Sequence, residues 1–191
     1  MAALDFPPEL LVKAQGSGLA VKLALFSVDG VLTDGRLHVD ANGEAMTTFS
    51  LQDGQGLALL PQAGITPVLL CRRDSPGLRR LAAHLGVARV LYGVDDTLAA
   101  ATPLLAECGA QWGEVAAIGS DWPDLPLLSR AGFACAPAGA HAEVRGVAHH
   151  VTAAPAGCGA AREFCDLLLM AAGRYERLLH AHHDAPHGDR P

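Results

Sequence analysis

Short hydrophobic runs alternate with amphipathic stretches along most of the chain. Turn-forming residues separate many of these runs, which is typical of buried strands that end in loops. The runs predict strands at residues 20–28, 65–70, 89–92, 115–118 and 133–136. The intervening stretches predict helices at 54–63, 76–85, 96–108, 125–131 and 160–179. This alternation predicts an α/β fold, in which helices cover both faces of a doubly wound, mostly parallel sheet.

A small insertion follows the first predicted strand. Residues 36–39 and 44–49 flank the turn sequence Asp-Ala-Asn-Gly and predict a β-hairpin over 36–49. Its place in the chain predicts that it overhangs the edge of the sheet. The predicted domain covers residues 19–179, between an N-terminal extension at 1–18 and a His-rich, disordered tail at 180–191. The tail histidines are either a metal-binding tract or part of a solvated, frayed end, and the second interpretation is preferred.

The composition agrees with one domain that buries a large core. The chain has 191 residues, of which 50% are hydrophobic and 18% charged, against about 25% charged residues in an average soluble domain. It shows no apolar run long enough to span a membrane and no secretory signal, so we expect a cytoplasmic location. The net charge of −6 and the presence of only two lysines disfavour nucleic-acid binding. The five cysteines form no CxxC pair, so we interpret them as small hydrophobic residues in a reducing compartment.

Polar residues follow several predicted strands at the point where ligands bind in parallel sheets. Such ligands lie beyond the carboxyl ends of the strands. The candidate residues at these ends are Ser27, Asp29, Cys71, Arg72, Ser120 and Asp121. We therefore expect a site along this edge of the sheet.

Several of these segments resemble one known family. Residues 23–34, LALFSVDGVLTD, are similar to the opening motif of haloacid dehalogenase superfamily phosphatases. Three further segments resemble one small branch of that superfamily, typified by 3-deoxy-D-manno-octulosonate 8-phosphate phosphatase. They are the hairpin with Asn42-Gly43-Glu44, FSLQDGQG at 49–56, and GCGAARE at 157–163 with the CDLLL that follows it. The resemblance covers about residues 20–175 and implies a Rossmann-like fold without a large cap domain.

The resemblance also implies a set of catalytic positions. In that family an Asp nucleophile also binds Mg²⁺, and a second Asp acts as general acid and base and offers its carbonyl to the metal. A hydroxyl and a lysine hold the phosphoryl group, and an acidic loop completes the metal site. Phosphoryl transfer depends on positioning and on neutralisation of charge, so these groups act together.

This chain departs from the pattern at most of those positions. Asp29 keeps the acid/base position, while the other matching positions are occupied by Ser27 (nucleophile), Cys71, Arg72 and Arg73 (hydroxyl motif), Thr97 (lysine) and Ser120 (first loop acid). Asp121 and Asp124 remain in the loop. One interpretation is that these two residues and Asp29 bind Mg²⁺ weakly. The other is that they bind no metal, in which case Asp29 caps a loop and the two loop acids stabilise a helix N-terminus. Ser27 would need a base to act as a nucleophile, and Asp29 is the candidate.

The preferred interpretation is a catalytically inactive, phosphatase-like protein that acts as a binding or scaffold protein in sugar-acid or cell-surface glycan metabolism. The alternative is a weak or altered Mg²⁺-dependent phosphomonoesterase that acts on a sugar-acid phosphate. A third interpretation places unrelated chemistry at Cys71, whose thiol pKa the neighbouring Arg72 and Arg73 would lower.

The partners expected are other copies of this chain, a protein partner, and a small phosphorylated or anionic ligand. An isolated two-stranded hairpin is marginal in water, so its apolar residues need a surface to pack against. These residues are Leu37, Val39, Met46 and Phe49. The resemblance implies a homotetramer built around the hairpin. Asp53 and the nearby glycines are interpreted as architectural, and Arg162 and Glu163 are expected to pair with each other or to bridge to a neighbouring subunit.

Overall fold

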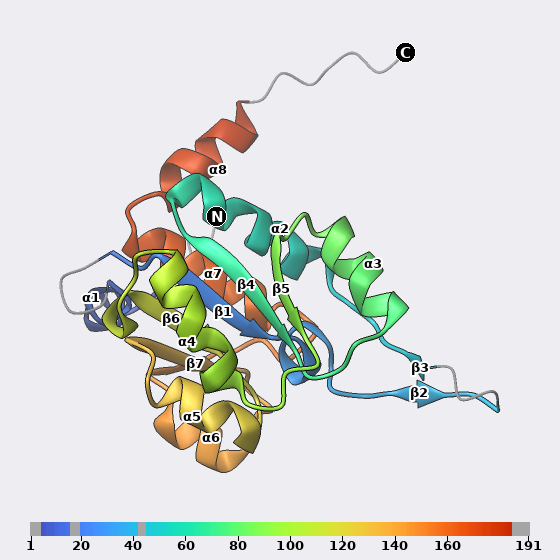
Figure 1. The fold of residues 1–191 in the computed structure, drawn as a ribbon. Coiled ribbons are helices and arrows are strands. Elements are labelled where there is room, and N and C mark those ends of the chain that lie inside the picture. The colour runs from blue at the N-terminus through green and yellow to red at the C-terminus, as the bar shows by residue number, and fades with distance from the viewer. Residues whose placement is uncertain (1–4, 16–19, 42–44, 185–191) are drawn as a thin grey trace, which may run out of the picture.

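The computed structural model describes residues 5–15, 20–41 and 45–184. Six parallel strands form one sheet in the order β5-β4-β1-β6-β7-β8, with β1 next to the centre (Figure 1). The strands are β1 (Leu23–Ser27), β4 (Thr66–Cys71), β5 (Arg89–Tyr92), β6 (Val115–Ile118), β7 (Phe133–Ala136) and β8 (His150–Val151). The predicted α/β class and the parallel sheet are confirmed.

Helices cover both faces of this sheet (Figure 1). One face packs against α1 (Pro8–Ala14), α2 (Leu51–Leu59), α3 (Pro76–His84), α7 (Ala160–Ala171) and α8 (Tyr175–His183), and the other against α4 (Thr97–Glu107), α5 (Leu125–Leu128) and α6 (Ala142–Val147). Side chains of a strand alternate between the two cores. Phe26 of β1 meets the Phe164 ring with centroids 5.3 Å apart, whereas Leu25 belongs to the core that contains Leu104.

Local sequence signals explain where several helices begin. Ser75 caps α3, since its hydroxyl accepts a hydrogen bond from the Leu78 N–H, and Pro76 is the first helical residue. Ser50 caps α2 in the same way, through the N–H of Asp53. Asp53 therefore lies in the first turn of α2, which begins at Leu51, three residues before the predicted start at residue 54.

The predicted boundaries at the two ends of the chain need correction. The single closing helix expected at 160–179 is two helices, because Gly173 has a φ of +63° and ends α7. The second, α8, extends to His183, so the start of the expected tail is helical. At the other end, α1 packs on α7 and its Ala14 is 1% exposed, so this part of the expected extension belongs to the core. His187 lies outside the described residues.

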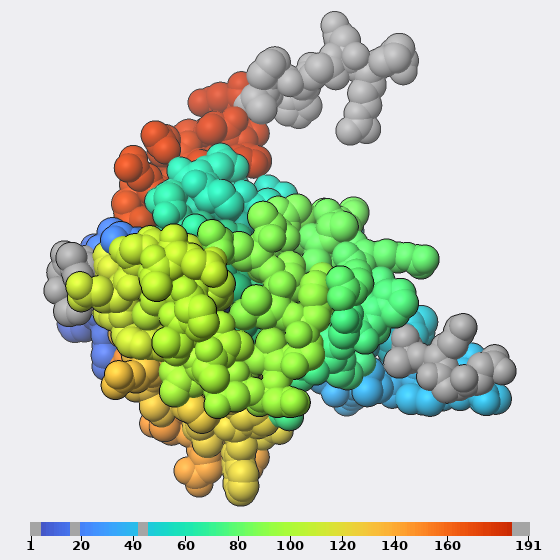
Figure 2. All heavy atoms as spheres, viewed as in Figure 1, coloured from blue at the N-terminus to red at the C-terminus, as the bar shows by residue number. Residues whose placement is uncertain are grey.

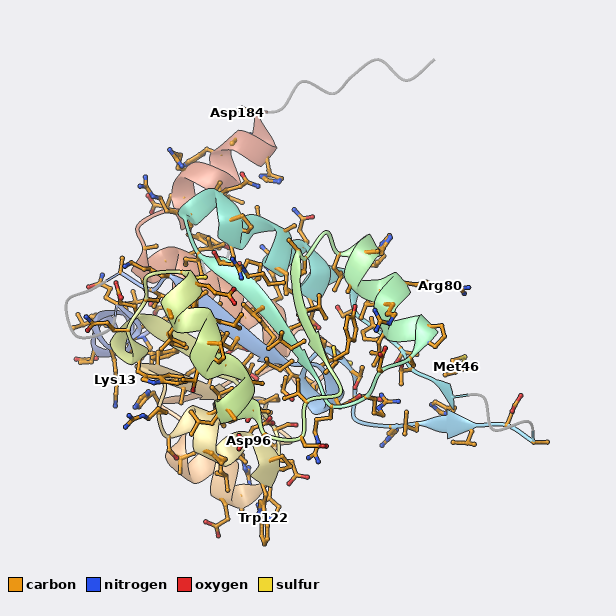
Figure 3. The ribbon with its side chains drawn as sticks, viewed as in Figure 1. Lys13, Met46, Arg80, Asp96, Trp122 and Asp184 are labelled. Carbon is orange, nitrogen blue, oxygen red and sulfur yellow. The ribbon has the colours of Figure 1, made fainter. Side chains whose placement is uncertain are left out.

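The predicted hairpin is present and projects from the body of the molecule (Figure 2). Its strands β2 (His38–Val39) and β3 (Ala45–Met46) are antiparallel. Residues 42–44, which include Asn42 and Gly43 of the expected turn, lie outside the described residues. Figure 3 shows Met46 far from the sheet, and it is 63% exposed. Leu37 and Val39 are exposed as well, whereas Phe49 packs against the core. In the part of the chain that the structure describes, no helix is both long and apolar enough to cross a membrane.

Candidate functional site

A cavity of about 230 Å³ lies at the carboxyl ends of β1, β4 and β6. It is lined by Ser27, Asp29, Gly30, Gly35, Arg72, Ser120, Asp121, Pro123 and Asp124. Six of these residues were candidate site residues in the sequence, and the fold brings them together from three separate segments. They are Ser27, Asp29, Arg72, Ser120, Asp121 and Asp124. The strand order explains this, because β4 and β6 are the two neighbours of β1.

A second cavity, of about 670 Å³, shares Gly30, Gly35, Ser120 and Asp121 with the first. Arg36, His141 and Cys158 also line this cavity, and no pattern in the sequence had marked them as site residues. His141 lies beyond the carboxyl end of β7, and its backbone N–H donates to the Ser120 carbonyl at 2.9 Å. The rule that ligand sites follow strand ends identifies His141 once β7 is known to lie beside β6.

Asp29 and Arg73 form an ion pair at the side of the first cavity. Arg73 donates from both Nη2 and Nε, so that both carboxylate oxygens of Asp29 accept a hydrogen bond, the Nε to Oδ2 distance being 3.2 Å. The hydrogen bond to Asp29 raises the pKa of Arg73 above its ordinary value. The general acid/base position is thus bound by a permanent cation, in the bidentate geometry that guanidinium and carboxylate groups favour.

Ser120 joins the first strand loop to the loop after β6. Its hydroxyl donates to the Asp29 backbone carbonyl at 3.2 Å, and its N–H donates to Oδ2 of Asp124 at 2.8 Å. The approach to the first loop is close, because a Cβ on Gly30 would lie 2.4 Å from Ser120 Oγ. Gly30 also has a φ of +79°, so both space and backbone conformation require glycine there.

The two remaining loop acids cap the short helical turn Trp122–Asp124. Asp121 Oδ1 accepts from the Trp122 N–H at 2.8 Å, while Oδ2 of the buried Asp124 accepts from the N–H of Ser120. Burial raises the pKa of Asp124, against the lowering effect of the Ser120 and Asp121 N–H groups, the Ser27 side chain and the charge of Arg72. In this structure both acids therefore cap the helical turn, as one of the two interpretations of the sequence has it.

Three expected phosphate-binding positions do not line the cavity: Arg73, which pairs with Asp29, and the buried Cys71 and Thr97. Cys71 is 2% exposed, and burial raises the pKa of its thiol to about 12. The expectation that Arg72 and Arg73 lower that pKa was wrong, because loss of hydration outweighs the attraction of Arg73. Thr97 is buried too, and its hydroxyl donates to the Pro123 carbonyl at 3.0 Å. Thr97 thus supports the loop after β6 from behind.

The oxygen atoms near the cavity do not form a cage for a divalent cation. In the described ranges, no three His, Cys, Asp or Glu side chains are grouped so as to hold a metal ion. The ligand atom expected from Asp29, its backbone carbonyl, accepts from the Ser120 hydroxyl, and the Asp29 carboxylate is bound by Arg73. Mg²⁺ demands near-octahedral oxygen coordination, so this donor set does not fit it.

The matched motifs outside the cavity tie α2 to the start of α7. The buried Asp53 carboxylate accepts from the N–H groups of Gly159 at 3.1 Å and Arg162 at 2.7 Å. The expected pairing of Arg162 with Glu163 was wrong. Arg162 binds Asp166 one helical turn later at 2.9 Å, and Glu163 accepts from the Ala153 and Ala154 N–H groups and contacts His150.

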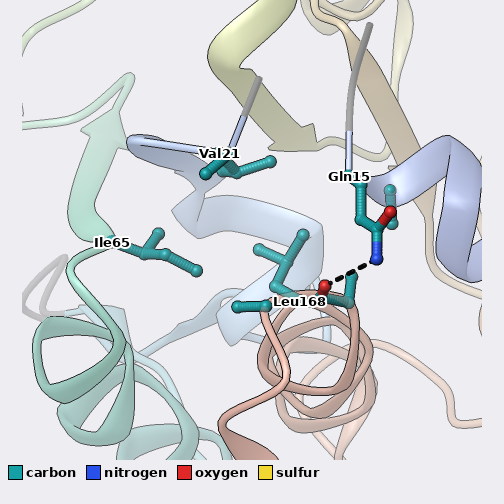
Figure 4. Close-up of a pocket in the computed structure, with 8 residues that line it drawn as sticks. Gln15, Val21, Ile65 and Leu168 are labelled. Carbon is teal, nitrogen blue, oxygen red and sulfur yellow. Dashed lines mark hydrogen bonds between the residues drawn. The ribbon is translucent and has the colours of Figure 1, made fainter. Parts of the chain in front are cut away.

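One further cavity lies at the opposite edge of the sheet (Figure 4). Its walls include Val21, Ile65 and Leu168, and Gln15 at its side donates to the Ala171 carbonyl at 3.0 Å. Val21 and Ile65 precede β1 and β4, so this cavity is on the amino-terminal side of the strands. Its lining is largely apolar and offers no group for phosphoryl chemistry.

Comparison with known proteins identifies close relatives. No family model matches the chain. The chain is 40% identical over 154 residues to the 3-deoxy-D-manno-octulosonate 8-phosphate phosphatase KdsC of Haemophilus influenzae, a match that covers 81% of this chain and 86% of that protein. It is also similar to a solved structure of a probable YrbI family phosphatase from Pseudomonas syringae. That match has a TM-score of 0.88 and 39% identity and covers 94% of this chain and 99% of the other.

A second solved structure contains ligands. It is the 3-deoxy-D-manno-octulosonate 8-phosphate phosphatase of Moraxella catarrhalis in complex with a magnesium ion, a phosphate ion and a 3-deoxy-D-manno-octulosonate molecule. The TM-score is 0.86 and the identity 32%, over 93% of this chain and 99% of the other. Fold and sequence therefore agree on the relatives.

Proposed function

Because the chain belongs to the 3-deoxy-D-manno-octulosonate 8-phosphate phosphatase family of the haloacid dehalogenase superfamily, we propose that it is a non-catalytic member that acts by binding or assembly. One observation carries this proposal: Ser27 stands at the end of β1, in the cavity, where the family motif has the carboxylate nucleophile. A serine hydroxyl carries no charge for a metal. It would also need a nearby base, and Asp29 is already bound to Arg73.

The positions of the two lysines support the same proposal. Lys22 precedes β1 and pairs with Glu114 at 2.9 Å, at the edge of the sheet opposite to the cavity. Lys13 lies in α1. Neither lysine lines the cavity; the cationic side chain that does is Arg72, and Arg73 pairs with Asp29 beside it.

A ligand for this cavity has to suit its charge. Arg72 lines the cavity and is exposed, and among the described residues its guanidinium takes part in no hydrogen bond or ion pair. We therefore propose a small phosphorylated or anionic ligand, bound for recognition in sugar-acid or cell-surface glycan metabolism. The KdsC relatives act, by their name, on 3-deoxy-D-manno-octulosonate 8-phosphate, so this compound and its sugar acid are the first ligands to assay.

The hairpin supports assembly with further copies of the chain. Leu37, Val39 and Met46 are 48%, 67% and 63% exposed on one projecting hairpin, and apolar side chains that gather on a surface are typical of an interaction site. We propose a homotetramer held through these hairpins. The same surface would also serve a protein partner.

Assay of phosphate release tests the non-catalytic proposal. The substrates are 3-deoxy-D-manno-octulosonate 8-phosphate and an aryl phosphate with Mg²⁺, and the Haemophilus influenzae relative is the positive control. Loss of one transition-state donor costs about 10²–10³ in rate, and several groups differ here, so we expect release at the background level. Turnover near about 1 s⁻¹, an ordinary enzymatic rate, would refute the proposal.

A weak or altered Mg²⁺-dependent phosphomonoesterase is the second candidate function. It is favoured by Asp29, which keeps the acid/base position in the cavity, and by the activity named for the relatives. Slow release that is proportional to protein concentration and abolished by a chelator would favour this candidate.

A further inference from the structure

His149 stands just before the edge strand β8 and binds both backbone groups of one residue of β7. Its own N–H donates to the Ala134 carbonyl at 2.8 Å, and its Nδ1 accepts a hydrogen bond from the Ala134 N–H at 2.9 Å. Ala134 is 0% exposed, and the pairing of β7 with β8 begins one residue later, with Cys135 opposite His150. The imidazole therefore takes the place of a strand carbonyl as the acceptor for a buried N–H.

This acceptor exists only while Nδ1 of His149 carries no proton. A backbone N–H acts only as a donor, so the ring is neutral and its hydrogen is on Nε2. Histidine is the side chain whose ordinary change of charge falls between about pH 5 and pH 8. A proton on Nδ1 would turn the acceptor into a donor that faces another donor, and the buried Ala134 N–H would lose its partner.

The surroundings of the ring also oppose its charged form. His149 is half-buried beside the buried ring of Phe133, with the centroids 5.7 Å apart. Burial, and then the charge of Lys13 in α1, lower the pKa of His149 below its ordinary value of 6.5. The folded edge therefore favours the neutral ring that the hydrogen bond requires.

The neighbouring ionisable groups do not share this requirement. Nε2 of His150 contacts Glu163 of α7 at 2.9 Å, and a protonated His150 keeps that contact because its Nε2 still carries a hydrogen. Burial raises the pKa of the Cys135 thiol in β7, so this thiol stays neutral. Helix α6 packs against β7, and its charged residues, Glu143 and Arg145, are exposed.

β8 leads directly into a wall of the second cavity. The strand has two residues, and after it the Thr152 N–H donates to the Ala136 carbonyl at 2.9 Å. Pro155, Ala156 and Cys158 then line the cavity of about 670 Å³. A strand this short has few backbone hydrogen bonds, so the loss of one contact weakens its attachment to the sheet.

We propose that His149 is a proton-sensitive clasp: its neutral ring fastens β8 to β7, and its protonation frees β8 and the cavity wall that follows it. The clasp itself does not depend on the proposed function. Its effect on a ligand rests on that function, because the second cavity adjoins the one in which the ligand is placed. The contribution of the clasp to stability is complete above about pH 6.5 and is lost as the pH falls through the lowered pKa.

Hydrogen exchange of the Ala134 amide in the purified full-length chain tests the proposal. NMR measures its protection, which is the slowing of exchange after correction for the intrinsic effect of pH, at pH 8 and pH 5. We expect this protection to fall by about tenfold or more at pH 5, because the opened edge takes up a proton there. Amides of the central strand β1 are the internal reference and should not show this fall.

Two variants separate His149 from its neighbour. His149→Asn should keep nearly equal protection of the Ala134 amide at both pH values, since the side-chain oxygen of Asn accepts the same hydrogen bond and does not titrate. His150→Gln is the matched control, because it removes the adjacent titratable ring and should keep the wild-type response.

The proposal would be overturned by equal protection of the wild-type Ala134 amide at both pH values or by an equal fall in β1. The same fall in His149→Asn, or its loss in His150→Gln, would also overturn it. Nitrogen NMR of the wild-type histidine rings gives a test without any variant, since a proton on Nδ1 of His149 at pH 8 would contradict the clasp. The phosphate-release assay is separate, because its outcome does not bear on the contact between His149 and Ala134.

Discussion

Replacing Ser27 by Asp introduces the missing carboxylate and tests whether the rest of the site can use it. The Ser27 side chain lies beside Asp124, which is 4% exposed and whose pKa burial already raises. Two like charges ~4 Å apart repel by about 4 kcal/mol at an effective dielectric constant of ~20. That energy corresponds to about three pKa units. Attraction to Arg72 offsets part of it, so we expect Ser27→Asp to lose about 2–3 kcal/mol of unfolding free energy at pH 8.

The pH dependence of this loss follows from the sign of the pKa shift. Repulsion from Asp124 and burial raise the pKa of the introduced carboxyl in the folded state above its unfolded value. Its destabilising effect is therefore largest above the raised pKa and fades as the pH falls through it. Chemical unfolding at pH 8 and pH 5 measures the difference. Ser27→Asn introduces a side chain of nearly the same shape as Asp but without charge. It should lose less stability than Ser27→Asp, and its loss should not depend on pH.

The same variant should release phosphate at the background rate. Groups that act as a unit give strongly non-additive effects, so we expect a detectable gain only when Ser27→Asp is combined with Ser120→Asp, Thr97→Lys and Cys71→Thr. Substantial Mg²⁺-dependent activity of Ser27→Asp alone, or a destabilisation equal at both pH values, would refute this reasoning.

Two predictions concern stability and assembly. Asp53→Ala leaves the Gly159 and Arg162 N–H groups without their acceptor and should cost about 3 kcal/mol of unfolding free energy, whereas Asp53→Asn should cost less. Burial raises the pKa of Asp53 above its ordinary value of 3.8. The contribution of Asp53 to stability therefore falls as the pH rises from 3.8 to the raised pKa. Asp53→Asn should lack this pH dependence, and a pH profile of stability unchanged from wild type would contradict the prediction. If the exposed hairpin residues such as Met46 form the proposed subunit contact, light scattering should give a tetramer of the 19.8 kDa chain. Met46→Asp should shift it to smaller species, and a monomeric wild-type protein would contradict the tetramer.

Local signals in the sequence predicted the elements of the fold closely. The strands 89–92, 115–118 and 133–136 match their predicted bounds, because each is a hydrophobic run between turn-forming residues. The cap at Ser75 and the hairpin were identified for the same local reason. The rule for strand ends then predicted that Ser27, Asp29 and the loop after 118 meet at one edge of the sheet.

Tertiary structure alone decided which partner each polar group has. Cys71 and Arg73 are two residues apart, yet one is buried in the core while the other reaches Asp29, 44 residues away along the chain. The sequence placed Arg162 beside Glu163, but neighbours along a helix point in different directions, and Arg162 meets Asp166 instead. Composition and periodicity determine which residues are buried and which strands form. Asp29 is bound by a guanidinium and a hydroxyl because separate loops meet in three dimensions. No pattern along the chain predicts these two contacts.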